Sequence, residues 1–320
     1  MIKVGIIGAA GYTGGELIRI LINHPEVEIV WAVSRSNANN YVYQVHADLF
    51  GDTDMKFAEA PTCKADVVVF CTAHGETGKL LAEYNFPEDV RILDFTNEFR
   101  VDNNEFVYGL PEINREKIKG CMKLANPGCF ATCIQLAMIP ALKAGIIQSD
   151  IQVSAITGST GAGVKPSATT HFSWRNDNMS VYKIFTHQHL AEINQTKNII
   201  APDMADKQVN FVPYRGDFAR GIHASVWFTS DKSEDEIKKI YADYYKDEPF
   251  THFYDGNLYL KQVTNTNKCI VSVKKEGNQV LVQSVIDNLL KGASGQATEN
   301  LNLMFGLDEK TGLRLKPSAF

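Results

Sequence analysis

The chain has 320 residues, of which 44% are hydrophobic and 22% are charged, and its formal net charge is -5. This length exceeds the size at which one hydrophobic core usually keeps growing, so two domains are expected. The acidic balance excludes the basic surface of proteins that bind nucleic acid or anionic membranes. No apolar run approaches the roughly 18 residues that span a bilayer, and no signal peptide is recognised, so a cytoplasmic protein is expected.

Short apolar strands alternate with helical stretches in the first part of the chain. Strands are expected at residues 3–7, 28–33, 66–71 and 91–95, and several are apolar throughout. A helix is expected from about Gly14 to Ile22, with its apolar residues on one face. Apolar strands linked by helices are typical of a parallel sheet with helices on both faces. We therefore expect an α/β domain with a Rossmann-type doubly wound parallel sheet.

The pattern of apolar and polar residues changes after about residue 143. A helix from Cys129 to about Leu142 comes before this change, and alternating β-rich runs follow it. We expect strands at 209–212, 222–229, 269–274 and 279–286, one long polar helix at 234–245 and a final helix at 293–305. The pattern predicts a second α+β domain, built on a mixed or antiparallel sheet, over residues 144–292, with residues 1–143 forming the first domain.

A glycine-rich segment follows the first expected strand and opens the first expected helix. Its residues Gly8, Gly11 and Gly14 follow the spacing G-x-x-G-x-x-G, a variant of the commoner G-x-G-x-x-G. Glycines allow the backbone to approach a pyrophosphate, whose charge is favoured at the helix N-terminus. We predict that these glycines, Tyr12 and Thr13 bind a dinucleotide; the alternative is a tight turn without a ligand.

The end of the second strand bears on the choice of dinucleotide. An acidic residue there binds the ribose 2′-hydroxyl of NAD, whereas this chain has Ser34 and Arg35. An arginine and neighbouring hydroxyls suit a 2′-phosphate, so NADP (NADPH) is favoured. A solvated surface charge is the alternative interpretation of Arg35.

Cys129 follows Asn126-Pro127-Gly128 and is expected in the first turn of a helix. Backbone N–H groups at a helix start favour a thiolate and can bind an oxyanion. Five other cysteines are present, and Cys71, at the end of a strand, is the second candidate nucleophile. Asn126 is a candidate substrate-binding residue.

A thiolate needs a proton partner, and histidine is the usual one. Of eight histidines, His187 and His189 form the most suggestive cluster, with Glu192 available to orient one of them. A zinc site lacks a further ligand, so no metal is expected. Ordinary histidines in a polar loop are the alternative.

A second glycine-rich segment, Thr157 to Pro166, carries hydroxyls and a lysine. Such a loop can cradle a phosphate or allow a close backbone approach, and a flexible connector is the alternative. We predict Gly161 and Gly163 as cofactor-binding residues and Ser159 as a substrate-binding residue. Arg220, next to a strand, offers a guanidinium that suits a substrate carboxylate.

These motifs are joined by others that together cover nearly the whole chain. They are Gly8–Gly14, Ser34-Arg35, Tyr108-Gly109-Leu110-Pro111-Glu112, Ala125–Cys129, Gly158–Gly163, the His187 cluster, Arg220-Gly221-Ile222, Gly295-Gln296-Ala297 and Asn302–Leu307. In this order they resemble the N-acetyl-gamma-glutamyl-phosphate reductases, an arginine-biosynthesis family related to aspartate-semialdehyde dehydrogenase. The Asn-Pro-Gly-Cys stretch and the Asn302–Leu307 ending are the most specific.

The resemblance implies that Cys129 is the nucleophile and that His187 is the acid/base, with His189 and Glu192 beside it. The family usually shows His-Arg-His-x-Pro-Glu, whereas this chain has Gln188 and Ala191 at the arginine and proline positions. The resemblance also implies that the C-terminal helix, within about residues 293–320, returns to the dinucleotide domain.

The implied reaction is NADPH-dependent reduction of an N-acyl-gamma-glutamyl phosphate through a cysteine thioester. The acyl group, acetyl or succinyl, stays open, and aspartyl or N-acyl-aminoadipyl phosphate are alternative substrates. A dinucleotide sensor without chemistry is the alternative from another class. An open sheet face in the second domain leads us to expect a homo-oligomer, a dimer or a tetramer.

Overall fold

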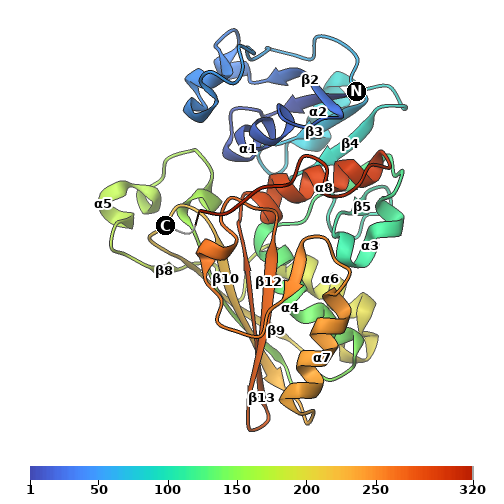
Figure 1. Ribbon diagram of the computed structural model, residues 1–320. Helices are drawn as coiled ribbons and strands as arrows, with labels where there is room; N and C mark the ends of the chain where they lie inside the picture. Colours follow the sequence, from blue (N-terminus) through green and yellow to red (C-terminus); the bar gives the residue numbers. More distant parts are fainter. Residues whose placement is uncertain (319–320) are drawn as a thin grey trace. The chain divides into compact units, whose positions relative to one another are not determined.

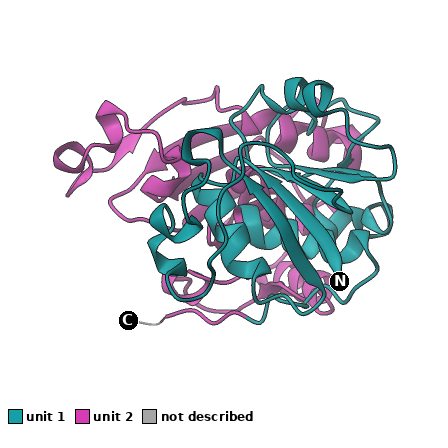
Figure 2. Ribbon diagram, turned by 90° about the horizontal axis from the view of Figure 1, so that it is seen from above, with its two compact units in different colours: residues 1–127, 293–314 teal, residues 128–292, 315–320 magenta. Residues whose placement is uncertain are grey.

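A computed structural model describes residues 1–318, which form two compact units (Figure 2). Unit 1 comprises Met1–Pro127 and Ala293–Arg314, and unit 2 comprises Gly128–Gly292 and the segment from Leu315. The first division therefore lies at residue 127 instead of near 143, because helix α4 (Cys129–Lys143) packs against strands of unit 2. Unit 1 is built from two separate parts of the chain, and the last described residues, from Leu315, belong to unit 2.

Unit 1 contains a six-stranded parallel sheet with strand order β2-β1-β3-β4-β6-β5 (Figure 1). The strands are β1 (Ile2–Ile7), β2 (Val27–Val33), β3 (Val67–Phe70), β4 (Arg91–Asp94), β5 (Val107–Tyr108) and β6 (Lys123–Ala125). The helices are α1 (Tyr12–Leu21), α2 (Thr77–Tyr84), α3 (Pro111–Ile118) and α8 (Gly295–Met304). The expected doubly wound parallel sheet is confirmed.

Both faces of this sheet are buried, and the side chains of β3 show why. Val67 and Val69 belong to the apolar cluster that includes residues of α1, α3 and α8. Val68 and Phe70 point to the opposite face and join a second cluster, against which residues of α2 pack. A strand covered on both faces has no polar side, which explains its uninterrupted apolar sequence.

Unit 2 contains a seven-stranded mixed sheet with strand order β11-β12-β13-β10-β7-β9-β8. Its strands are β7 (Ile151–Thr157), β8 (Ser180–Val181), β9 (Val209–Arg215), β10 (Ile222–Thr229), β11 (Thr251–Phe253), β12 (Cys269–Glu276) and β13 (Gln279–Ile286). Only the pairs β7/β9 and β11/β12 are parallel. Buried and half-exposed residues alternate along β7, so one face of the sheet is covered, as expected for an α+β domain.

Helix α4 is the central helix of unit 2 and packs against β10, β13, α6 (His189–Ile200) and α7 (Glu234–Tyr245). Pro140 lies inside α4 and has no N–H to donate to the carbonyl of Leu136. The hydroxyl of Tyr245 donates to that carbonyl instead. A side chain of α7 thus replaces the lost helix bond, so the proline is tolerated in a buried helix.

Two helical features differ from the expectations. The later part of the chain holds two long polar helices, α6 as well as α7, instead of one. The sequence of α6 shows no clear apolar stripe because the inner face of the helix buries the polar residues Thr196 and Lys197. Lys197 Nζ donates a hydrogen bond to the carbonyl of Met204 at 2.7 Å. The last helix begins with a π-helical turn (Leu290–Ser294) before α8.

The remaining short helix, α5 (Phe172–Arg175), belongs to a segment that leaves the sheet between β7 and β8 (Figure 1). Across residues 1–318, no helix combines the length and the apolar character that crossing a bilayer requires.

Candidate active site

Cys129 is the first residue of α4 and is half-buried. Gly128 precedes it in an extended conformation, with φ −70° and ψ 149°, at the N-cap position. Because glycine has no side chain, no N-cap group competes for the N–H groups of the first turn. The backbone of Gly292 packs against the cysteine, since a Cβ built at Gly292 would lie 2.8 Å from Cys129 Cβ. The sulfur therefore lies at the helix end where negative charge is favoured.

Two side chains of α6 contact Gly128. Glu192 Oε2 accepts a hydrogen bond from the Gly128 N–H at 2.9 Å, and the glutamate is buried. The imidazole of His189 lies against the same glycine, because a Cβ built at Gly128 would fall 2.3 Å from His189 Nε2. A side chain at position 128 would displace this ring. Residues distant in sequence are thus brought to the peptide that precedes Cys129.

His187 lies in an aromatic environment next to His189. Its ring centroid is 5.4 Å from those of Phe130 and Phe211 and 5.7 Å from that of Tyr182. The two histidine rings are 4.6 Å apart, and the backbone N–H of His189 donates to His187 Nδ1 at 3.2 Å. Because Nδ1 is an acceptor, the proton of a neutral His187 is on Nε2.

The charge state of His187 follows from this environment. Burial lowers the pKa of His187 to about 4, and the positive charges of Lys183 and Arg215 act in the same direction. The imidazole is therefore neutral at pH 7. His187 and His189 thus have different surroundings: the first is enclosed by rings and the second touches the residue before the cysteine.

The other cysteines lack the setting of Cys129. Cys71, the second candidate, is buried in the core of unit 1, and burial strongly raises the pKa of its thiol. Burial also raises the pKa of Cys133, whose sulfur donates to the Ser284 carbonyl at 3.4 Å. For Cys121, burial raises the pKa to about 11. Of the cysteines, Cys129 is the one at the start of a helix.

The first glycine segment lies between β1 and α1, as its sequence predicts. Gly8 has φ +80°, and a Cβ there would lie 2.6 Å from the Cys71 carbonyl oxygen. A Cβ at Gly14 would lie 2.7 Å from the Cα of Ala9. Gly11 is the N-cap of α1, which then begins with Tyr12 and Thr13. A close-packed glycine turn that opens a helix fits the pyrophosphate of a dinucleotide.

The residues after β2 are Ser34 and Arg35. Arg35 is exposed and forms an ion pair with Glu83 and a hydrogen bond to the Tyr84 hydroxyl at 3.1 Å. The hydroxyl of Ser34 accepts a hydrogen bond from Asn37 Nδ2 at 3.2 Å. Exposed ion pairs of this kind contribute little to stability, and binding of a 2′-phosphate by Arg35 stays a prediction.

The second glycine segment lies between β7 and α5 in unit 2. Ser159 and Gly161 lie in a 3₁₀ turn (Ser159–Ala162), and Gly163 follows with φ +80°. The Ser159 N–H donates to the Phe218 carbonyl at 2.8 Å. A Cβ at Gly158 would lie 2.4 Å from the Ala219 carbonyl oxygen. This segment is therefore fixed to residues 218–219 by close backbone approach, one of the two functions expected for its glycines.

Two predicted substrate-binding residues have strong partners within their own units. Arg220 forms a two-pronged ion pair with buried Asp287, with Nε at 3.0 Å and a terminal nitrogen at 3.3 Å. Asn126 Nδ2 donates to the Ala293 carbonyl at 3.1 Å, and its Oδ1 accepts from Asn300 Nδ2 at 3.0 Å. These contacts favour positioning roles, and substrate binding by either residue stays a prediction.

Tyr182 and Arg215 lie near His187, and the sequence did not predict them as residues of this site. Tyr182 lies next to His187, and Arg215 Cζ is 4.7 Å from the centroid of the Tyr182 ring. No spacing marks these residues, because β8 and β9 bring them together by antiparallel pairing.

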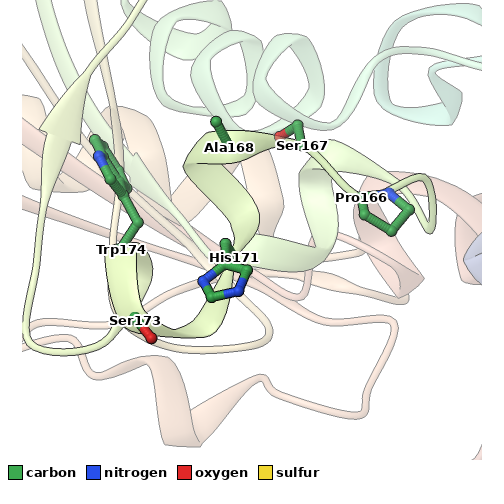
Figure 3. A pocket seen from close by; sticks show the side chains of 6 residues that line it. All are labelled: Pro166, Ser167, Ala168, His171, Ser173 and Trp174. Atoms are coloured by element: carbon green, nitrogen blue, oxygen red, sulfur yellow. The ribbon is translucent and has the colours of Figure 1, made fainter.

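A pocket in the segment between β7 and β8 is separate from this site. It is lined by Pro166, Ser167, Ala168, His171, Ser173 and Trp174, none of which is a predicted site residue (Figure 3). Within residues 1–318, no group of three or more His, Cys, Asp or Glu side chains is arranged to hold a metal ion.

Comparisons with known proteins cover both units. Residues 3–121 match the family model of the semialdehyde dehydrogenase NAD binding domain, and residues 129–288 match that of the semialdehyde dehydrogenase dimerisation domain. Among solved structures, aspartate semialdehyde dehydrogenase II of Vibrio cholerae, complexed with ASA, has a TM-score of 0.74 at 18% identity. The alignment covers 96% of this chain and 98% of that one, and it supports the fold. Aspartate semialdehyde dehydrogenase with NADP from Candida albicans has a TM-score of 0.71 at 14% identity, covering 95% and 98%.

Closer relatives share the whole length of the chain. N-acetyl-gamma-glutamyl-phosphate reductase of Phocaeicola vulgatus is 54% identical over 323 residues, and that of Christiangramia forsetii is 50% identical over 322 residues. Both alignments cover 100% of each chain. The resemblance found in the sequence is confirmed, and so is the assignment to the oxidoreductases: this chain belongs to the N-acetyl-gamma-glutamyl-phosphate reductase family of the semialdehyde dehydrogenases.

Proposed function

We propose that the protein reduces an N-acyl-gamma-glutamyl phosphate to the N-acyl-glutamate semialdehyde, with NADPH as reductant and release of phosphate, as a step of arginine biosynthesis. The names of its full-length relatives support the reaction. The observation that carries the chemistry is the position of Cys129, which starts α4 after a glycine contacted by His189 and Glu192.

In the first step, the Cys129 thiolate attacks the carbonyl carbon of the acyl phosphate. A C–S bond forms, and the oxyanion that develops is stabilised by N–H groups at the start of α4. The bond from this carbon to the phosphate oxygen then breaks, and phosphate leaves with the electron pair. The product is a thioester on Cys129.

Bound NADPH supplies the hydride that reduces this thioester. The resulting thiohemiacetal collapses when its C–S bond breaks, which releases the semialdehyde and restores the thiolate. His189 accepts the thiol proton of Cys129 when the thiolate forms and returns it to the sulfur after the C–S bond has broken, which restores the thiol.

This assignment moves the acid/base role from His187, as first predicted, to His189. The imidazole of His189 lies against Gly128, next to the nucleophile. His187 is neutral, surrounded by rings, and uses Nδ1 to accept the His189 N–H, which fits a positioning role. Glu192 holds the Gly128 peptide and thereby the start of α4.

We propose NADPH instead of NADH because Arg35 and Ser34 follow β2, where an acidic residue would bind an unmodified ribose. Gly8, Gly11, Tyr12, Thr13 and Gly14 would hold the pyrophosphate. Gly161 and Gly163 of the second glycine segment stay predicted cofactor contacts, and Ser159 stays a predicted substrate contact.

A reverse assay tests this function. The enzyme is mixed with a semialdehyde, NADP and phosphate, and formation of NADPH is followed by absorbance. We expect activity with N-acyl-glutamate semialdehyde, far less with aspartate or aminoadipate semialdehydes, and a lower KM for NADP than for NAD. Activity only with aspartate semialdehyde would contradict the proposal, and a lack of turnover with every semialdehyde would favour a sensor.

We also propose that the protein is a homo-oligomer, a dimer or a tetramer, located in the cytoplasm. The match of residues 129–288 to a dimerisation domain supports self-association. On the face of the unit 2 sheet opposite its buried face, Trp227 is 36% exposed and pairs with half-exposed Leu281. Light scattering after gel filtration would measure the subunit number.

A further inference from the structure

Cationic side chains gather beside His187 in unit 2. Lys183 and Arg215 are both close enough to affect the charge of His187. A third cation, Arg175, donates to the backbone carbonyl of Arg215 at 2.7 Å. The neighbouring Gln188 is a neutral amide, and its Oε1 accepts a hydrogen bond from Lys183 Nζ at 2.8 Å.

Of these cations, Arg215 has the environment that best fits a ligand-binding residue. It is the last residue of β9, and its guanidinium Cζ is 4.7 Å from the centroid of the Tyr182 ring. The Tyr182 ring in turn is 5.7 Å from that of His187. A guanidinium stacked on an aromatic ring keeps its N–H edge available for another group.

No acidic side chain compensates the charge of Arg215 within the described part of the chain. Its Nε is buried and, among residues 1–318, has no hydrogen-bond partner. Asp217, two residues on, accepts instead from the backbone N–H of Asp177 at 2.7 Å. Arg215 as a whole is half-buried, and a cation with a buried, unpaired donor is costly unless an anion meets it. This environment favours the approach of an anion to Arg215.

Arg220 differs from Arg215 because an acidic side chain compensates its charge. It was expected to bind a substrate carboxylate, but buried Asp287 holds it at 3.0 and 3.3 Å and compensates its charge. Of the two arginines in the 215–220 segment, the one with its charge still uncompensated is Arg215.

Tyr182 connects this cation to the nucleophile. Burial raises the pKa of Tyr182 to about 12, and the charge of Cys129 acts in the same direction. The rings of Tyr182 and of Phe130, the residue after Cys129, lie 5.7 and 5.4 Å from the His187 ring, so Tyr182 and the first turn of α4 contact the same imidazole. Arg215 lowers the pKa of the phenol, through its positive charge and a side-chain hydrogen bond, by less than burial raises it. Tyr182 is therefore a neutral phenol at pH 7, next to both Arg215 and His187.

We propose that Arg215, stacked on Tyr182 beside His187, binds an oxyanion of the substrate, a carboxylate or the phosphate, and so holds the acyl carbon near Cys129. The planar fork of a guanidinium matches both groups in a two-pronged hydrogen bond. This inference rests on the proposed function, and it assigns Arg215 to substrate binding.

The experiment compares Arg215→Met, which keeps an unbranched stem on Tyr182, with Arg215→Lys, which keeps the charge. Lys239→Met is the matched control, because it removes one positive charge from an exposed site of α7 in the same unit. For each variant, KM and kcat are measured in the reverse assay with N-acetyl- and N-succinyl-glutamate semialdehyde and with phosphate. Thermal unfolding and NADPH binding report whether the variants fold.

We expect Arg215→Met to raise one KM on the order of 10- to 100-fold, the loss that fits a hydrogen-bonded charge, with a smaller change in kcat. Arg215→Lys should recover part of it. A change in the KM for phosphate assigns the phosphate. A change for both semialdehydes assigns the α-carboxylate, and a change for the succinyl compound alone assigns the carboxylate of the acyl group.

Two failures are distinguishable. If the wild-type enzyme turns over no N-acyl-glutamate semialdehyde, the proposed function is wrong. If the wild type is active and folded Arg215→Met behaves like Lys239→Met in every KM, Arg215 does not bind the substrate and the inference is overturned.

Discussion

Cys71 and Cys129 both follow a strand of the parallel sheet, yet the two sites differ in what surrounds the sulfur. Cys71 directly follows β3 and is buried in the core of unit 1, and burial strongly raises the pKa of its thiol. Cys129 starts a helix, is half-buried and follows a glycine that His189 and Glu192 contact. A cysteine that only follows a strand is a buried core residue. A nucleophilic cysteine also needs a position at the start of a helix, access for the substrate and a proton partner.

The largest expected effect comes from exchanging sulfur for oxygen at each site. Cys129→Ser should lower kcat by at least about 10³-fold, because loss of a nucleophile removes the covalent route. Cys71→Ser, the control, should keep kcat within about threefold, and its cost should appear in stability, since a hydroxyl replaces a buried thiol. Steady-state kinetics and urea unfolding measure both. Comparable kcat losses in the two folded variants would remove the distinction between the sites.

The next largest effect concerns the proton partner that Cys129 has and Cys71 lacks. His189→Gln should lower kcat by about 10²- to 10⁴-fold, the contribution typical of a positioned acid/base. His171→Gln, at an exposed histidine of α5's N-cap, is the control and should retain full activity. The pH dependence of kcat should also change only in the first variant. If His187→Gln loses activity and His189→Gln does not, the acid/base is His187.

Substitution of Gly8 tests how much close backbone packing next to Cys71 contributes to stability. Gly8→Ala should reduce the free energy of unfolding by about 2–4 kcal/mol, because the residue has φ +80° and its Cβ would meet the Cys71 carbonyl at 2.6 Å. Gly51→Ala is the matched control: it has φ +92° but nothing within 4 Å of its Cβ, so only about 1–2 kcal/mol is expected. Equal losses would mean that close packing at Gly8 is unimportant.

The smallest effect concerns pH. The folded-state pKa of His187 is about 4, below the ordinary 6.5, so between these values the unfolded chain binds a proton that the folded one does not. Keeping His187 neutral therefore contributes nothing unfavourable above pH 6.5, but it lowers the free energy of unfolding as the pH falls toward 4. The decrease is about 2 kcal/mol between pH 7 and pH 5. Urea unfolding of the wild type and His187→Gln at both pH values measures this. Equal pH dependence in the two proteins would contradict a buried neutral His187.

Regular elements with a uniform environment were predictable from the sequence. The expected ranges 222–229, 279–286 and 234–245 coincide with β10, β13 and α7. In these elements one side is buried and the other exposed, so the apolar period is visible. Helix α6 was missed because it buries polar groups, such as Lys197, against backbone carbonyls.

The chemistry of the site was predictable only where it is local. A glycine before Cys129 and the start of a helix can be read from neighbouring residues. The contact of His189 with Gly128, the compensation of Arg220 by Asp287 and the stacking of Arg215 on Tyr182 depend on strand pairing and helix packing. No sequence spacing encodes those long-range contacts.

The most direct test of the central claim is to trap the thioester. The enzyme is mixed with N-acyl-glutamate semialdehyde and NADP in the absence of phosphate, so the acyl group has no acceptor except slow hydrolysis. We predict a burst of about one NADPH per chain and, by peptide mass spectrometry, one acyl group on Cys129, also formed by Cys71→Ser but not by Cys129→Ser. An acyl group on another residue, or an active enzyme that shows no burst and no adduct, would contradict the account.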